Sequence, residues 1–152
     1  ADLSFSQENG SFKTQQMKNK RVKDAYASKW PALEAELKSK KVIPSSLEVF
    51  IRIFKKEKEL ELWVKNKADV KFQFLKKIPI CASSGDLGPK RKEGDYQVPE
   101  GIYDIPSLNP NSSYYLAMLV GYPNKSDKIL KTRRNGKTSL PVCFGHLRSK
   151  RF

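Results

Sequence analysis

The first regular pattern along the chain is helical and covers residues 13–44. Val22, Tyr26 and Trp30 follow one another at intervals of four, which places them on one face of a helix. Lysines and arginines are spread around this face. Pro31 predicts a kink or the start of a second helix, because a proline inside a helix removes a backbone hydrogen bond.

The period of the pattern changes to two after residue 44. Residues 48–54, 60–65 and 70–78 alternate apolar and other side chains, and short charged or polar turns separate them. This arrangement predicts an antiparallel meander of three strands. One face of the meander needs a cover, and the preceding helix is the nearest candidate. The side chains expected on the inward face are Val49, Ile51, Ile53, Leu60, Leu62, Val64, Val70, Phe72 and Phe74.

Glycines and charged residues dominate the next segment, residues 82–97. It is too long for a hairpin turn, and loops of this length are usually functional or disordered. Strands are expected again over residues 101–105 and 114–120. The turn signals Asn109-Pro110-Asn111 and Tyr122-Pro123-Asn124 punctuate them.

These patterns predict an α+β fold, with an N-terminal helical segment packed on a mainly antiparallel β-sheet. The expected division is a loop or disordered segment at 1–12, a helical segment at 13–44, a β domain at 45–128 and a basic tail at 129–152.

The charge balance narrows the class of partner. The chain has 152 residues, with 30 Lys and Arg against 16 Asp and Glu, which gives a net charge of +14. This charge favours a polyanion, such as nucleic acid, an anionic membrane surface or an acidic cell-wall polymer. An unspecific basic surface is the alternative. No apolar run approaches the length of a membrane span, so an integral membrane protein is excluded.

Sites for metals and nucleotides are not evident in the sequence. It has no Walker A motif and no HExxH motif. The single histidine excludes a multi-histidine metal site, and two cysteines cannot form a four-cysteine zinc site. We therefore expect neither a metal nor a cofactor.

One block of motifs supports a family resemblance. Pro79-Ile80-Cys81 is followed by Ser84-Gly85-Asp86-Leu87-Gly88-Pro89-Lys90, Lys92-Glu93-Gly94-Asp95, Pro99-Glu100-Gly101, Leu108-Asn109-Pro110-Asn111-Ser112-Ser113-Tyr114 and Gly121-Tyr122-Pro123-Asn124. In combination these motifs resemble the L,D-transpeptidase (YkuD-type) family, in its murein-acting, YafK-like branch. The similarity covers roughly residues 12–128.

The resemblance implies a protein of the periplasm or cell envelope, reached after removal of a signal peptide. Its partners would be the stem peptides of peptidoglycan, and nucleic acid is not expected. The family works by cysteine acyl transfer, in which a thiolate attacks an amide carbonyl and the resulting thioester is resolved by an amine or water. The oligomeric state is left open.

The catalytic motif of this branch, a His-Gly pair followed by Ser-x-Gly-Cys, is absent from the chain. Its place is taken by the basic tail, which looks like the product of a truncation or a shifted reading frame. Cys143 and His146 are the only catalytic candidates in the tail. The alternative function is a non-catalytic basic module that binds peptidoglycan or another polyanion.

The remaining predictions concern the other cysteine and the glycine-rich loop. Cys81 follows two apolar residues at a strand end, which favours a buried, inert thiol; a disulfide with Cys143 is the alternative. Glycines permit positive φ and close backbone approach, and charges between them can hold a charged peptide. The predicted substrate-binding residues are Gly85, Gly88, Lys90, Arg91 and Lys92, with a solvated connector as the alternative.

Overall fold

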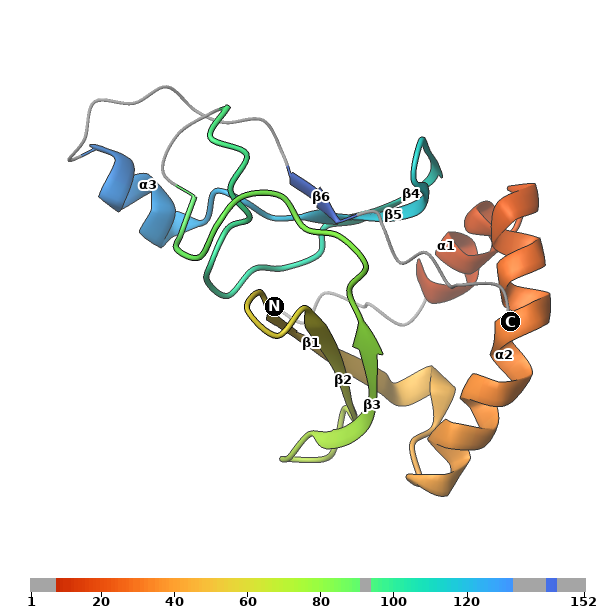
Figure 1. Ribbon diagram of the computed structural model, residues 1–152. Coiled ribbons are helices and arrows are strands. Elements are labelled where there is room, and N and C mark those ends of the chain that lie inside the picture. Colours follow the sequence, from red (N-terminus) through yellow and green to blue (C-terminus); the bar gives the residue numbers. More distant parts are fainter. Residues whose placement is uncertain (1–7, 91–93, 133–141, 145–152) are drawn as a thin grey trace.

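The computed structural model describes residues 8–90, 94–132 and 142–144. In chain order its elements are α1 (Glu8–Gln16), α2 (Lys20–Ser39), a 3-10 turn η1 (Pro44–Ser46), β1 (Leu47–Phe54), β2 (Glu59–Asn66), β3 (Gln73–Pro79), β4 (Ser107–Ser112), β5 (Tyr115–Val120), α3 (Lys125–Thr132) and β6 (Val142–Phe144). The predicted α+β class is confirmed. Figure 1 shows two sheets on the same side of α2, one toward each end of this helix.

The helical segment breaks at a different place from the one expected. Asn19 caps α2, and its side chain accepts a hydrogen bond from the backbone N–H of Arg21 at 2.9 Å. Pro31 lies inside α2 and does not end it. The break thus follows the local capping signal of Asn19. The first helix already begins at Glu8, within residues that were expected to be loop.

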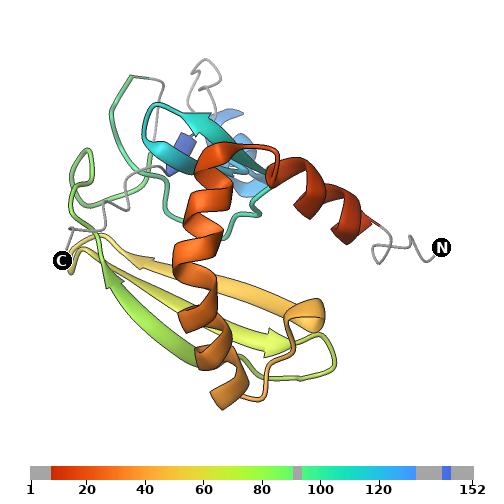
Figure 2. The same ribbon diagram turned by 90° about the vertical axis from the view of Figure 1, so that its right-hand side faces the viewer.

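The first sheet has the strand order β1-β2-β3, and both pairings are antiparallel. The predicted meander is therefore confirmed. The helix α2 crosses one face of this sheet (Figure 2). Between them lies a core of Leu37, Val42 and Val64, each at most 2% exposed. The partly buried residues packed against this core are Trp30, Leu33, Leu47 and Leu75.

The expected inward face of the third strand is wrong. β3 begins only at Gln73, and Val70 is 92% exposed in the turn ahead of it. A register shift between β2 and β3 leaves Leu75 without a direct partner on β2. Phe74 pairs with Trp63 on the outer face, and Leu75 packs against the core instead. The bulge reverses the face that simple alternation assigns to this strand.

The second sheet has the strand order β4-β5-β6. The strand expected at residues 101–105 is wrong, because this segment forms neither a strand nor a helix. Residues 109–111, expected to be a turn, lie inside β4, where the pairing with β5 is irregular between Asn109 and Ser112. β6, in the basic tail, pairs antiparallel with β5.

The start of α2 is tied to the hairpin of the second sheet. Arg21 Nη1 donates to the carbonyl oxygens of Ser112 at 2.7 Å and Tyr115 at 3.1 Å. The Tyr115 hydroxyl donates in return to the Arg21 carbonyl oxygen at 3.2 Å, and the guanidinium lies 5.6 Å from the Tyr115 ring centre. The side chains of Asn19 and Asn111 are joined at 2.6 Å. α2 therefore holds both sheets, one at each end.

Among the described residues, no helix has the length and apolar character needed to cross a membrane.

Candidate functional site

The glycine-rich loop, residues 84–101, connects the two sheets and contains the predicted binding residues. Its two ends are brought together by Lys55, which directly follows β1. The Lys55 ammonium donates to the carbonyl oxygens of Gly88 at 2.7 Å and Val98 at 3.2 Å, and to the Glu100 carboxylate at 2.9 Å. An ammonium has three N–H donors, so the three bonds use its full capacity.

Glu100 adds a further hydrogen bond to the contact between Lys55 and the loop. Its Oε1 atom, which accepts from Lys55, also accepts the backbone N–H of Gly88 at 2.9 Å. The Lys55 side chain is only 11% exposed. A lysine at this depth is stable as a charged group only when it is paired and hydrogen-bonded. The Lys55–Glu100 pair therefore holds the loop against the end of β1.

A second ion pair lies inside the loop itself. Lys90 Nζ is 2.6 Å from Asp95 Oδ1, and the two side chains are 8% and 11% exposed. The same Asp95 oxygen accepts the backbone N–H of Gln97 at 3.1 Å. Lys90 was predicted to bind the carboxylates of a ligand, but its ammonium is committed to a carboxylate of the loop. Arg91 and Lys92 lie outside the described residues.

Glycine is required at positions 85 and 88, the two predicted for this site, for different reasons. Gly85 has a φ of +73°, and a Cβ placed there would lie 2.5 Å from Gln97 Oε1 and 2.8 Å from the Tyr96 carbonyl oxygen. Gly88 has a φ of +111°, with open space around the position of its absent Cβ. Gly85 is thus required by close packing as well as by conformation, and Gly88 by conformation alone.

A tyrosine–aspartate contact borders the C-terminal end of the loop. The Tyr103 hydroxyl lies 3.3 Å from both Asp127 Oδ1 and the Glu100 carbonyl oxygen. Burial raises the pKa of Tyr103 well above its ordinary value, and the negative charge of Asp127 adds to this rise. Asp127 is also held in place at the start of α3, where its backbone N–H and carboxylate exchange hydrogen bonds with Asn124.

Of the cysteine and histidine candidates, Cys81 is the one whose side chain lies within the described residues. Cys81 is exposed, so the expectation of a buried thiol is wrong; the cysteine lies two residues beyond Pro79, where β3 ends. Cys143 lies in β6, with its backbone paired to Leu119. Its side chain and His146 lie outside the described part, as does the suggested disulfide.

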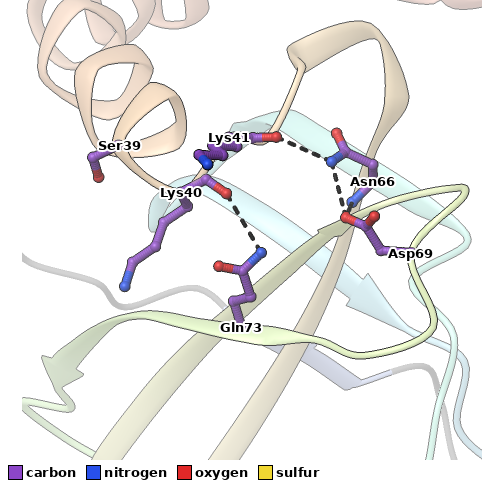
Figure 3. Close-up of a pocket in the computed structure, with 6 residues that line it drawn as sticks. All are labelled: Ser39, Lys40, Lys41, Asn66, Asp69 and Gln73. Atoms are coloured by element: carbon purple, nitrogen blue, oxygen red, sulfur yellow. Dashed lines mark hydrogen bonds between the residues drawn. The ribbon is translucent and has the colours of Figure 1, made fainter.

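A surface pocket of about 380 Å³ lies at the other end of the first sheet (Figure 3). Its polar groups bind one another. Asn66 Nδ2 donates to the Lys41 carbonyl oxygen at 3.1 Å and to Asp69 Oδ2 at 2.9 Å, and Gln73 donates to the Lys40 carbonyl oxygen at 3.4 Å. Asn66 and Gln73 thus satisfy the carbonyl groups of Lys41 and Lys40, which directly follow α2, so the polar groups of the pocket serve to cap this helix.

Comparison with known proteins supports the family resemblance. The chain is 44% identical over 82 residues to "Putative L,D-transpeptidase YafK" of Escherichia coli strain K12, and equally to the protein of that name from E. coli O157:H7. The chain is similar to an L,D-transpeptidase of the YafK type. No family model matches.

The resemblance predicted from the loop motifs is thereby confirmed. The aligned residues make up 53% of this chain and 32% of each YafK relative, so the match spans about a third of the relatives' length. Lys55 and Glu100 were missed as a pair by sequence reasoning. Lys55 belongs to a run of alternating Lys and Glu that is typical of an exposed turn, and no local signal distinguishes it.

Proposed function

We propose that this chain acts in the cell envelope on the stem peptides of peptidoglycan, as an L,D-transpeptidase-type protein that works by cysteine acyl transfer. The observation that carries the proposal is the 44% identity to the YafK relatives over 82 residues. The net charge of +14 supports it, since stem peptides carry free carboxylates.

In this reaction the cysteine thiolate attacks an amide carbonyl carbon, and the amine leaves with a proton. The resulting thioester is then attacked by a second amine or by water, which frees the thiol. Cys143 with His146 as its base is the candidate pair, because imidazole can take the thiol proton at neutral pH. The chain lacks the family's His-Gly and Ser-x-Gly-Cys motifs, so substrate binding and catalysis are tested separately.

The glycine-rich loop is the proposed peptide-binding element. Lys55 and the Lys90–Asp95 pair hold its backbone, which leaves Arg91 and Lys92 as the proposed contacts to peptide carboxylates. Lys90 then acts as a positioning residue, because its ammonium is already paired with Asp95 at 2.6 Å. A test of ligand contacts should therefore change Arg91 and Lys92 and leave Lys90 intact.

Catalysis is tested with muropeptides that contain diaminopimelate. The purified chain is incubated with them, and altered cross-links or released peptides are followed by mass spectrometry. Acylation by a carbapenem is measured on the intact protein as a second readout. We expect the Cys143→Ser variant to lose both signals and the Cys81→Ser variant to keep them. Turnover that survives in Cys143→Ser would remove Cys143 from the nucleophile role.

A non-catalytic binding module is the second candidate, favoured by the charge and by the missing motif. It predicts co-sedimentation with purified peptidoglycan without any change in the muropeptides. The measurement compares wild type, Arg91→Ala/Lys92→Ala and the control Lys23→Ala/Lys29→Ala, which removes two exposed cations from α2.

Binding should fall in the loop variant and remain nearly unchanged in the control, at both low and moderate salt. Duplex DNA serves as a competing polyanion. A steep loss of DNA binding with salt, at an affinity above that for peptidoglycan, would instead point to phosphate contacts and a nucleic-acid partner.

A further inference from the structure

The two edges of the first sheet differ in their protection against pairing. β3, the edge shown in green in Figure 2, contains Lys76, Lys77 and Pro79 and the bulge at Leu75. Lysines, prolines and bulges are the devices by which natural sheets keep an edge from pairing with another strand. β1, the opposite edge, has none of them. Its eight residues pair with β2 in one unbroken register.

The outer edge of β1 is also rich in exposed apolar side chains. Val49 is 53% exposed, Phe50 41% and Ile53 36%, and these residues lie on both faces of the sheet. Among the described residues, no backbone hydrogen bond is made to this edge of β1. A long, mostly apolar edge without lysine, proline or a bulge is a template for an added strand.

Two charged residues, Glu48 and Arg52, determine which strand fits. They lie on the same face of β1, two positions on either side of Phe50. Glu48 forms an ion pair with Lys65 at 3.0 Å, and Arg52 with Glu61 at 3.3 Å, both across to β2. Both side chains remain nearly half exposed, 42% and 45%, so each can take a second partner.

We infer that β1 pairs antiparallel with β1 of a second copy of this chain, with Phe50 opposite its own counterpart. In this register Glu48 lies opposite Arg52 of the second copy, and the two-fold axis repeats the pair. The four central strands of the resulting six-stranded sheet then carry continuous rows of alternating charge in the order Lys65, Glu48, Arg52 and Glu61, the last two from the second copy. Val49 faces Ile51 on the other surface of the sheet.

Other symmetric registers do not give this complementarity. Moving the two-fold axis from Phe50 to Val49 or Ile51 places Glu48 and Arg52 opposite uncharged residues. Moving it to Glu48 or Arg52 places like charges face to face, which is unfavourable in a sheet. The sequence of β1 is therefore self-complementary in one register. The inference does not rest on the proposed function, because it concerns association and not peptide chemistry.

Charge exchange tests the register. In Glu48→Arg, position 48 and Arg52 of the second copy are both positive; in Arg52→Glu, both are negative. Each variant alone should therefore dimerise about tenfold or more weakly than wild type, as measured by sedimentation equilibrium. An equimolar mixture should form a heterodimer with a dissociation constant within about threefold of the wild-type value, because opposite charges face each other again. This rescue also shows that both variants are folded.

Cysteine cross-linking provides an independent distance. In a Cys81→Ser/Cys143→Ser background, Phe50→Cys places two thiols directly across the two-fold axis, where opposite Cα atoms are about 4.5–5.5 Å apart. This is within disulfide range, whereas Val49→Cys is offset by two residues and too distant. We expect rapid oxidation to a covalent dimer for Phe50→Cys and not for Val49→Cys.

A wild-type chain that stays monomeric up to millimolar concentration overturns the inference. So does a dimer whose affinity is indifferent to the charge exchange, since its interface would then lie elsewhere.

Discussion

Lys55 Nζ lies 2.9 Å from Glu100 Oε1, and this contact joins the end of the first sheet to the end of the glycine-rich loop. The two residues are separated by 45 positions in the chain. Because Gly88 also bonds to both side chains, three distant segments meet at one ion pair. The loop is thus held in a fixed position against the end of β1.

Removing the ammonium should loosen this loop. Lys55→Met keeps the aliphatic stem but leaves the Gly88 and Val98 carbonyl groups without their donor. We expect a loss of about 1.5–3 kcal/mol in the free energy of unfolding, the range for hydrogen bonds to charged groups. Urea unfolding measures the loss, and hydrogen exchange should become faster at Gly88. The neighbouring exposed Lys56 supplies the control: Lys56→Met should change stability by less than about 0.5 kcal/mol. Equal effects of the two variants would contradict the anchoring role.

The buried pair within the loop should behave non-additively. Lys90→Met leaves the Asp95 carboxylate buried beside an apolar side chain, and we expect a loss of about 3 kcal/mol. Adding Asp95→Asn to this variant removes the buried negative charge as well and should restore part of the stability. Thermal unfolding of the two single variants and the double variant gives the coupling free energy. Simple addition of the two single losses would mean that the ion pair does not form in solution.

The two loop glycines should differ in their tolerance of alanine. Gly88→Ala is expected to cost about 1–2 kcal/mol, the cost of a positive φ for a residue with a Cβ, because the added methyl group would meet no residue beyond its chain neighbours. Gly85→Ala should cost more, since its methyl group would also meet the Tyr96 backbone and the Gln97 side chain. The comparison of their unfolding midpoints in urea checks this order. If Gly88→Ala were the more damaging of the two, the packing around Gly85 would be different from the one described.

Tyr103 should make stability fall at alkaline pH. Its pKa is raised in the folded protein, so the protonated hydroxyl stabilises the fold below the ordinary pKa of 10.0. This contribution is lost as the pH rises above that value, because the unfolded chain ionises first. Tyr103→Phe has no proton to lose, and its stability should fall less between pH 9 and pH 11. Guanidinium unfolding at the two pH values measures the difference. An identical fall in both proteins would show that Tyr103 titrates normally.

Much of the fold can be predicted from local patterns in the sequence. Strict alternation over residues 48–54 and 60–65 predicts two strands, since successive side chains of a strand point to opposite faces. Charged turns between them predict the meander, and the apolar stripe through Val22, Tyr26 and Trp30 predicts the covering helix. The loop motifs around Gly85 and Gly88, in combination with the blocks that follow them up to Asn124, carried the family resemblance.

Tertiary structure decided the face of β3 and the roles of the charged side chains. The bulge at Leu75 arises from how β3 meets β2, so alternation within the strand could not reveal it. Lys55 and Lys90 look like ordinary surface lysines in the sequence, and only folding brings a carbonyl or carboxylate to each of them. A short-range pattern reports which side chains share a face. It does not report which polar groups, tens of residues apart, become paired in the folded protein. In this protein the pair of Lys55 and Glu100 holds the glycine-rich loop in place.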